Sequence, residues 1–177
     1  MTCALPLLTV LAFAAGSTER RRRFFSLTSV SATPTNARFV ARYSELYSEM
    51  VTRTYSPNSS YDAFYLVAYA TLALGSEPVT GTALARAIGR LLPPGRLIDV
   101  GPSEIFDALN TLKAGENIDL NGATGRLDFD LETGEAPVDF AVLCVRGGTD
   151  PAAAESVESG LTYDATAGVL RGTMHCP

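Results

Sequence analysis

Three acidic residues alternate with apolar residues within the stretch IDLNGATGRLDFDLETGEAP, residues 118–137. Asp128, Asp130 and Glu132 could ligate calcium, act as a catalytic acid and base, or line the exposed side of a hairpin. An EF-hand calcium loop needs a glycine at its sixth position, where this sequence has Thr133, and helices on both sides. A catalytic pair needs one carboxyl group in a desolvated pocket, which a polar stripe does not provide. We therefore expect these carboxylates to be structural and no metal to bind here.

The stretch Ser59-Ser60-Tyr61-Asp62 is the stronger candidate for a binding site. Tyr61 stands where an apolar helix is predicted to begin, and Asp62 could accept backbone N–H groups there as a cap. A helix start also offers oriented donors and a partial positive charge to an anionic ligand. The simpler alternative is a structural cap beside a core aromatic residue. Spacing alone leaves both interpretations open.

Histidine and cysteine restrict the possible chemistry. His175 is the only histidine, which disfavours zinc sites and Ser-His-Asp or Cys-His catalytic sets. We therefore expect no enzyme activity and no cofactor. The three cysteines, Cys3, Cys144 and Cys176, show no CxxC spacing. In an oxidising compartment Cys144 and Cys176 could form a disulfide between adjacent strands, and two buried free thiols are the alternative.

The composition indicates a folded chain whose main partner is not a nucleic acid. The 177 residues are 46% hydrophobic and 19% charged, which suits a single domain with a real core. A net charge of −5 argues against a nucleic acid partner. The run Arg20–Arg23 is expected to form a solvated edge or a loop and not a binding patch. The apolar segment before it is either a secretory signal or a core element, although these arginines follow the apolar run instead of preceding it.

The first two thirds of the chain are predicted to be mainly helical. Asn36 is the expected N-cap of a helix that reaches about Arg53, and an apolar helix should follow from Tyr61 to Gly75. An amphipathic helix is expected over residues 80–92, ended by Pro93-Pro94-Gly95. RLIDVG reads as a short strand, and a fourth helix should end at Gly115.

After residue 115 the pattern alternates with the period of a strand. Residues 125–134 and 137–145 are predicted to form a hairpin connected through Thr133-Gly134. A second hairpin should turn near Ala167-Gly168. The stretch RGGTDPAAAESVESG between the two hairpins is expected to be a loop or a short helix.

Four segments in this order together resemble one protein family. They are NARFVARYSELY, SSYDAFYLVAYATLALG, GTALARAI and LKAGENIDLNGATGRLDFDLETGEAPVDFAVLCV. The aromatic-Asp-Ala helix start, the amphipathic helix and the GATGRLDFDLETG motif resemble the second half of type I periplasmic binding proteins. They are most similar to the branched-chain amino acid branch of ABC importer substrate-binding proteins. Residues 22–146 carry the resemblance, while 1–21 precede it and 147–177 form a less typical loop and hairpin.

The resemblance implies an α/β fold with two lobes that close around a small molecule. RFFSLTSVSATP would carry the chain from the second lobe to the first, and the helices from Asn36 to Ala114 would belong to the first lobe. The hairpin from Ile118 would return to the second lobe. Tyr61 would lie in the cleft with Asp62 beside it, and these two residues are the expected ligand-binding positions.

The implied function is that of a solute-binding component of an ABC importer, without enzyme activity. It would bind a branched-chain amino acid or a similar small molecule, in the periplasm or otherwise exported, and serve a membrane permease. Alternatives are a ligand-sensing module of a signalling receptor and a truncated remnant that binds nothing. The sequence lacks the family's first half, so we expect uncovered apolar faces and self-association.

Overall fold

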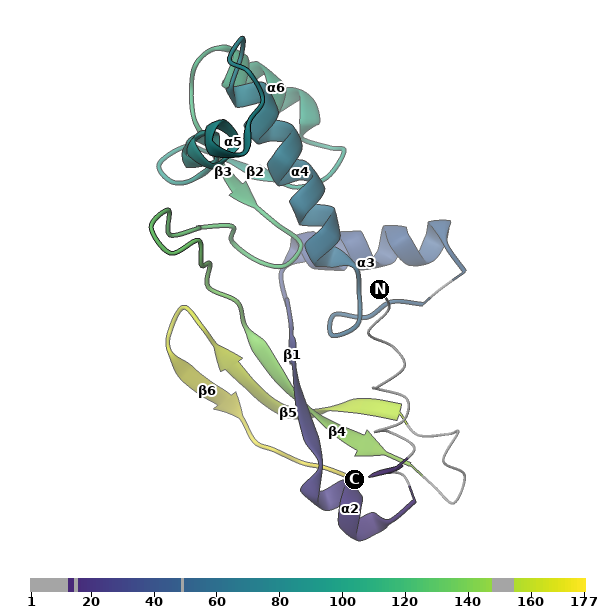
Figure 1. Cartoon of the computed structure of the whole chain (residues 1–177). Helices are drawn as coiled ribbons and strands as arrows, with labels where there is room; N and C mark the ends of the chain where they lie inside the picture. Colours follow the sequence, from purple (N-terminus) through teal and green to yellow (C-terminus); the bar gives the residue numbers. More distant parts are fainter. Residues whose placement is uncertain (1–12, 15, 49, 148–154) are drawn as a thin grey trace. The chain divides into compact units, whose positions relative to one another are not determined.

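The computed structural model describes residues 13–14, 16–48, 50–147 and 155–177 (Figure 1). Its architecture is mixed α/β, as predicted, with a four-stranded antiparallel sheet and a two-stranded parallel sheet. The chain forms two compact units, Ser31–Val138 and a second made from Met1–Val30 and Asp139–Pro177. The chain thus passes from one unit to the other twice. Most of residues 1–21, including Cys3 and most of the apolar segment, lie outside the described residues.

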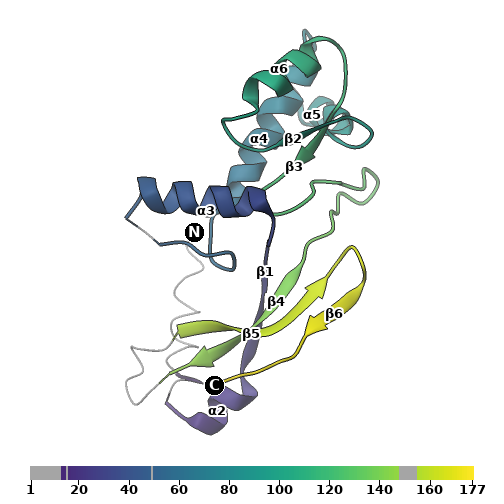
Figure 2. The same ribbon diagram turned by 180° about the vertical axis from the view of Figure 1, so that it is seen from behind.

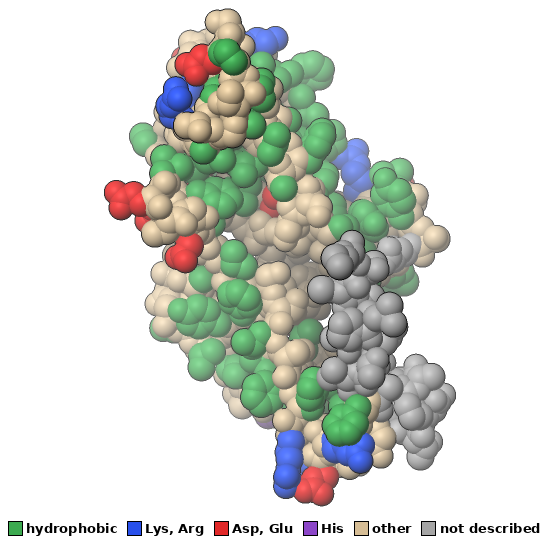
Figure 3. Space-filling view, viewed as in Figure 1, with side chains coloured by type: hydrophobic (Ala, Val, Ile, Leu, Met, Phe, Trp, Pro, Cys, Tyr) green, Lys and Arg blue, Asp and Glu red, His purple; other side chains and the backbone are tan. Residues whose placement is uncertain are grey.

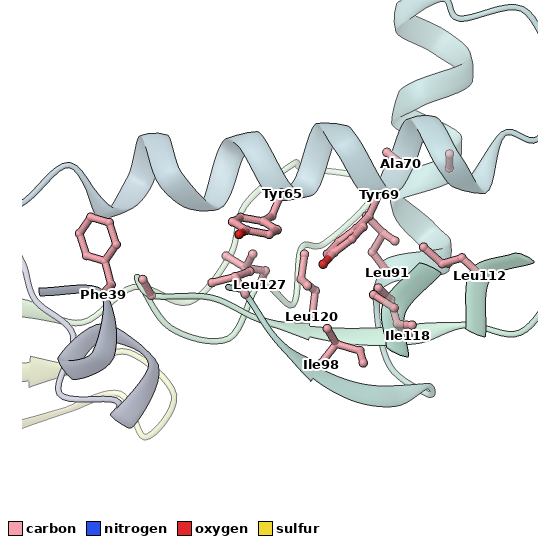
Figure 4. Packing of buried hydrophobic residues seen from close by; sticks show 14 residues of the cluster. Phe39, Tyr65, Tyr69, Ala70, Leu91, Ile98, Leu112, Ile118, Leu120 and Leu127 are labelled. Carbon is pink, nitrogen blue, oxygen red and sulfur yellow. The ribbon is translucent and has the colours of Figure 1, made fainter. Parts of the chain in front are cut away.

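The unit Ser31–Val138 combines helices with a short parallel sheet. Strands β2 and β3 pair in register, with Ile98 opposite Leu120. Figure 4 shows Tyr65 and Tyr69 of helix α4 pointing from the helix toward these strands. The elements in chain order are α3 (Pro34–Leu46), α4 (Asn58–Ala73), α5 (Gly81–Ile88), the 3-10 helix Gly89–Leu91, β2 (Arg96–Asp99), α6 (Ile105–Lys113) and β3 (Ile118–Asn121).

Helix α3 differs from its predicted bounds at both ends. Its N-cap is Thr33, whose hydroxyl accepts a hydrogen bond from the Asn36 backbone N–H at 3.1 Å. Pro34 then occupies the first turn, where a missing N–H costs nothing. The prediction of Asn36 as the cap was therefore wrong: Asn36 is buried, and its side chain donates to the Ser31 carbonyl at 2.8 Å. The helix ends at Leu46 instead of near Arg53.

Helix α4 has an apolar sequence but is not covered on every side. It begins at Asn58, three residues before the predicted start, and ends two residues before Gly75. Tyr65 and Tyr69 are buried, while Phe64 and Val67 on another face are 68% and 54% exposed. Figure 3 shows apolar side chains on the visible surface of this unit. The sequence pattern correctly predicted the helix, but not that one face is left uncovered.

The predicted hairpin between residues 125–134 and 137–145 does not form. β3 pairs in parallel with β2, and after it only an isolated bridge joins Asn121 to Arg126. Residues 130–135 make a tight turn in which the Asp130 side chain accepts the backbone N–H groups of Glu132 and Thr133 at 2.7 and 3.1 Å. The turn prediction was right, but the alternating pattern before it is not paired as a strand, and Leu131 is 60% exposed.

The second unit is an antiparallel sheet with strand order β1-β4-β5-β6. Figure 2 shows its β5–β6 hairpin from behind. The predicted turn is confirmed: the Gly168 N–H bonds to the Asp164 carbonyl at 2.9 Å, and Gly168 has a positive φ. β5 already begins at Glu155, so part of the predicted loop or helix is a strand. The elements are α2 (Thr18–Arg23), β1 (Phe25–Ser29), β4 (Phe140–Arg146), β5 (Glu155–Asp164) and β6 (Val169–Gly172).

A disulfide joins the two cysteines that the sequence suggested. Cys144 lies on β4 and Cys176 follows β6, with their Cα atoms 5.5 Å apart. The expectation that they lie on adjacent strands was wrong, because β5 stands between β4 and β6 in the sheet. The tail reaches Cys144 alongside β5, where the His175 N–H donates to the Ser159 carbonyl at 2.8 Å.

The arginine run forms the short helix α2 instead of a loop. Ser17 caps it, and Arg23 pairs with Glu19 at 2.7 Å, both side chains being more than 70% exposed. The expectation of a solvated position therefore holds for Arg23. Within the described part of the chain, helices fall short of the length and apolar character that crossing a bilayer requires.

Candidate functional site

The unit Ser31–Val138 contains a pocket of about 290 Å³ with a mixed polar and apolar lining. Helix α3 supplies one wall, Tyr61 at the start of α4 supplies a second, and the segment after β2 supplies a third. The lining residues are Thr35, Arg38, Phe39, Arg42, Tyr61, Asp99, Val100, Gly101, Pro102, Ser103 and Glu104. The pocket thus contains Tyr61, one of the two predicted ligand-binding residues.

Helical spacing explains the wall that α3 provides. Thr35, Arg38, Phe39 and Arg42 follow one another at intervals of three, one and three residues, which places them along one face of the helix. Phe39 is buried, and its ring lies 4.7 Å from the ring of Tyr61, centroid to centroid. This contact fixes the start of α4 against the face of α3 that carries both arginines.

A hydrogen-bonded ion pair forms one polar side of the pocket. The Arg38 guanidinium contacts the Asp99 carboxylate, which also accepts the Asn121 amide at 2.6 Å. The desolvation of Asp99 is outweighed by the hydrogen bonds from Asn121 and Arg38, so its pKa lies below the ordinary value. Asp99 therefore stays ionised, and its charge is already matched by Arg38.

Two further charged side chains of the pocket, Glu104 and Arg42, make fewer hydrogen bonds than Arg38 and Asp99. Glu104 accepts the Asp99 backbone N–H at 2.8 Å through one carboxylate oxygen. Arg42 is exposed, and no hydrogen bond or ion pair joins it to another of the described residues. The pocket therefore offers one cation and one partly used carboxylate beyond the Arg38–Asp99 pair. Such an arrangement can bind a small molecule that carries a negative group, or one that carries both charges.

Tyr61 presents a neutral hydroxyl to the pocket. Burial, together with a hydrogen bond to Tyr65, raises its pKa above the ordinary value, while the nearby Arg42 acts in the opposite direction. A phenol with a raised pKa remains a hydrogen-bond donor throughout the physiological range. Tyr61 can thus contribute both an apolar ring face and a polar tip to a ligand.

The structure places Asp62 outside the pocket lining, at 3% exposure. The prediction that Asp62 could cap α4 was wrong, because the helix begins at Asn58 and has no side-chain cap. Its carboxylate accepts the backbone N–H groups of Ala123 and Thr124, at 2.8 and 2.7 Å, and the Thr124 hydroxyl at 2.5 Å. Asp62 thus fastens the loop after β3 to α4, a contact between residues about sixty positions apart that no local pattern indicates.

Gly122 is required for this contact. A Cβ atom at Gly122 would lie 2.4 Å from an oxygen of the Asp62 carboxylate, which is far inside contact distance. The motif GATG therefore owes its first glycine to the close approach of Asp62.

Sequence reasoning missed the charged residues of the pocket. Arg38 and Arg42 stand one turn apart on the same predicted helix as Phe39, and that spacing could have pointed to them. Asp99 lies within the predicted strand RLIDVG and Glu104 follows it, but their meeting with α3 depends on tertiary structure. Two of the three acidic residues in the alternating stretch have structural roles, since Asp128 pairs with Arg126 at 3.1 Å and Asp130 closes a turn.

Metal ligands are not grouped among the described residues: nowhere there do three His, Cys, Asp or Glu side chains come together in a way that could hold an ion. Comparison with models of protein families, with curated proteins and with solved structures finds no match. The proposed role of the pocket must therefore be argued from its own chemistry.

Proposed function

We propose that this chain is a solute-binding protein of the type I periplasmic kind, serving an ABC importer without enzyme activity of its own. Its ligand is an amino acid or a similar small molecule bound beside Tyr61. The observation that carries the proposal is the pairing of an aromatic wall with charges of both signs in one pocket of about 290 Å³. Small-molecule sites combine apolar surface with a few placed polar groups in this way.

The charges suit the two ends of an amino acid. A carboxylate near Arg42 would meet a guanidinium that has no partner among the described residues, and guanidinium–carboxylate contacts are strong and directional. An ammonium group near Glu104 would meet a carboxylate with one oxygen engaged by a backbone N–H. Phe39 and Tyr61 would pack against the ligand's apolar part.

Two features outside the pocket support the same proposal. The chain passes between its two units at Val30–Ser31 and again at Val138–Asp139, later than the return predicted at Ile118, and two crossings suit a protein built from two lobes. The disulfide between Cys144 and Cys176 suits an oxidising, exported location, where such bonds persist. A membrane permease would be the partner.

A ligand panel tests this proposal. We expect leucine, isoleucine, valine, phenylalanine or a related amino acid to raise the unfolding temperature, because a ligand present at about 100 times its Kd stabilises the native state by about 2.7 kcal/mol. Arg42→Ala should abolish the shift. Arg86→Ala is the matched control, because Arg86 forms an exposed pair with Glu77 and lines no described pocket.

The contrary result would be a folded protein whose unfolding temperature none of these compounds changes. That outcome would favour the remnant that binds nothing. A shift that is equal in the wild type and in Arg42→Ala would place the ligand elsewhere on the protein.

A further inference from the structure

We propose that the binding site extends into an adjoining aromatic pocket and that its preferred ligand is an aryl-substituted carboxylate. The inference rests on the proposed function and names its ligand class. A second cavity, of about 340 Å³, lies against α3 and shares Phe39, Arg42 and Tyr61 with the first. Because three residues line both cavities, one ligand can occupy parts of each.

The second cavity is lined almost entirely by aromatic and aliphatic side chains. Tyr43 lies on α3 beyond Phe39, Tyr47 directly follows that helix, and Pro57 directly precedes α4. Neighbouring ring centroids are 5.7 Å apart for Phe39 and Tyr43, and 4.6 Å apart for Tyr43 and Tyr47. These rings form a row in which an additional aromatic ring can pack at the usual spacing of about 4.5 to 7 Å.

Part of this row is open to solvent in the described structure. Tyr47 is 57% exposed and Leu46 is 67% exposed, although both line the cavity. Covering them with a ligand ring removes apolar surface from water, which favours binding. An aliphatic side chain would gain the same burial but not the added attraction between aromatic rings.

Arg42 lies where the two cavities meet, since it lines both. It is the only charged side chain among the residues that line the aromatic cavity. A carboxylate bound there must therefore be joined to the ring by a short linker, and the far end of the ring must be uncharged. A phenyl ring with a two- or three-carbon acid side chain meets these requirements, with or without an amino group directed to Glu104.

Calorimetric titration at pH 7 with 3-phenylpropionate, 3-cyclohexylpropionate and 3-phenylpropan-1-ol tests the inference. The cyclohexyl acid should bind about 3 to 10 times more weakly than the phenyl acid, because it lacks ring–ring attraction. The alcohol should bind at least about 10 times more weakly, because it lacks the charge that pairs with Arg42.

Two variants test whether the phenyl ring of the ligand binds in the aromatic cavity. Tyr47→Ala should weaken 3-phenylpropionate binding about 10-fold while leaving glycine binding unchanged, since Tyr47 lines only the aromatic cavity. Phe106→Ala is the control, because Phe106 is 76% exposed and lines neither cavity. Circular dichroism should show that both variants fold. If Tyr47→Ala unfolds, Tyr43→Leu removes a ring of the same cavity while keeping an apolar side chain.

The possible failures can be told apart. If leucine binds and 3-phenylpropionate binds no better than acetate, the extended site is wrong and the proposed function stands. If Tyr47→Ala and Tyr43→Leu both leave 3-phenylpropionate binding unchanged, the ring lies elsewhere and the extended site is also wrong. If neither amino acids nor aryl acids bind the folded protein, both proposals fail.

Discussion

At the scale of single residues, the most instructive side chain is Asp62, which the sequence suggested as a ligand contact or a helix cap. It is buried and accepts three hydrogen bonds from Ala123 and Thr124. Burial raises its pKa above the ordinary value, although these hydrogen bonds act in the opposite direction. Asp62 therefore holds the loop after β3 in place and lies outside the proposed binding site.

Replacing Asp62 with Asn should lower the free energy of unfolding by about 2 to 4 kcal/mol, because the amide NH₂ group cannot accept the donors of Thr124. Urea denaturation measures this loss, and hydrogen exchange should show faster exchange at Ala123 and Thr124. Asp107→Asn is the matched control: Asp107 pairs with Arg96 at 2.8 Å but both side chains are more than half exposed, so we expect a change of about 0.5 kcal/mol or less. Equal losses in the two variants would contradict the structural role of Asp62.

Asp99 should make stability depend on pH in the opposite sense from Asp62. Its pKa is lower in the folded protein than in the unfolded chain, so its contribution is present above the ordinary value of about 3.9 and is lost as the pH falls through the folded value. The stability lost between about pH 5 and pH 2 should therefore be smaller in Asp99→Asn than in the wild type. Carboxyl NMR titration should place the pKa of Asp62 above 3.8 and that of Asp99 below 3.8. The reverse order would contradict the burial of Asp62 and the hydrogen bonds that Asp99 accepts from Asn121 and Arg38.

Among the helices and strands, the sequence correctly predicted those whose ends are determined by proline, glycine or aspartate at the end itself. Pro93-Pro94-Gly95 ends the helical segment that begins at Gly81, and Gly115, with a φ of 82°, follows α6. Asp164 and Gly168 likewise define the β5–β6 turn. In each case residues close together in the chain determine the conformation.

Elements that depend on distant contacts were predicted less well. The alternation around Leu127 and Phe129 fits a strand, yet the loop before it is held by Asp62, and the Leu127 N–H reaches the Leu120 carbonyl at 3.2 Å. The parallel pairing of β2 with β3 could not be read from either strand alone. The candidate site also depends on distant contacts. The sequence identified Tyr61, but it did not indicate that Arg42 and Glu104 line the same pocket.

The disulfide is the element-scale feature with the clearest energetic consequence. It joins residues 32 positions apart. Closing a loop of that length stabilises the native state by about 3 to 4 kcal/mol through the entropy of the unfolded chain. We expect reductant to lower stability by about this amount in a Cys3→Ser background, and to have no effect once Cys144 and Cys176 are also serine. Hydrogen exchange should quicken around β4–β6 more than around β2 and β3. Unchanged stability on reduction would contradict this prediction.

At the scale of the whole molecule, the notable feature is the apolar surface of the unit Ser31–Val138. Phe64 and Val67 lie one turn apart on α4 and are both more than half exposed. Exposed apolar faces of this kind promote association between proteins. We propose that copies of this chain associate through α4.

Sedimentation velocity over a range of protein concentrations tests this association. The sedimentation coefficient should rise with concentration for the wild type and stay at the monomer value for the double variant Phe64→Ser, Val67→Ser. Leu170→Ser serves as the control, because Leu170 is 65% exposed but lies on β6 in the other unit. A wild type that remains monomeric at every concentration would rule out association through this face.

We propose that the pocket between α3, Tyr61 and the segment after β2 binds a small carboxylate ligand. NMR spectra of isotope-labelled protein, recorded while 3-phenylpropionate or leucine is added, test it most directly. We predict shifts at the Arg42 side chain and at the backbone of Gly101 and Ser103, with little change at the β5–β6 turn. Shifts confined to other parts of the chain, or none at saturating ligand, would contradict the claim.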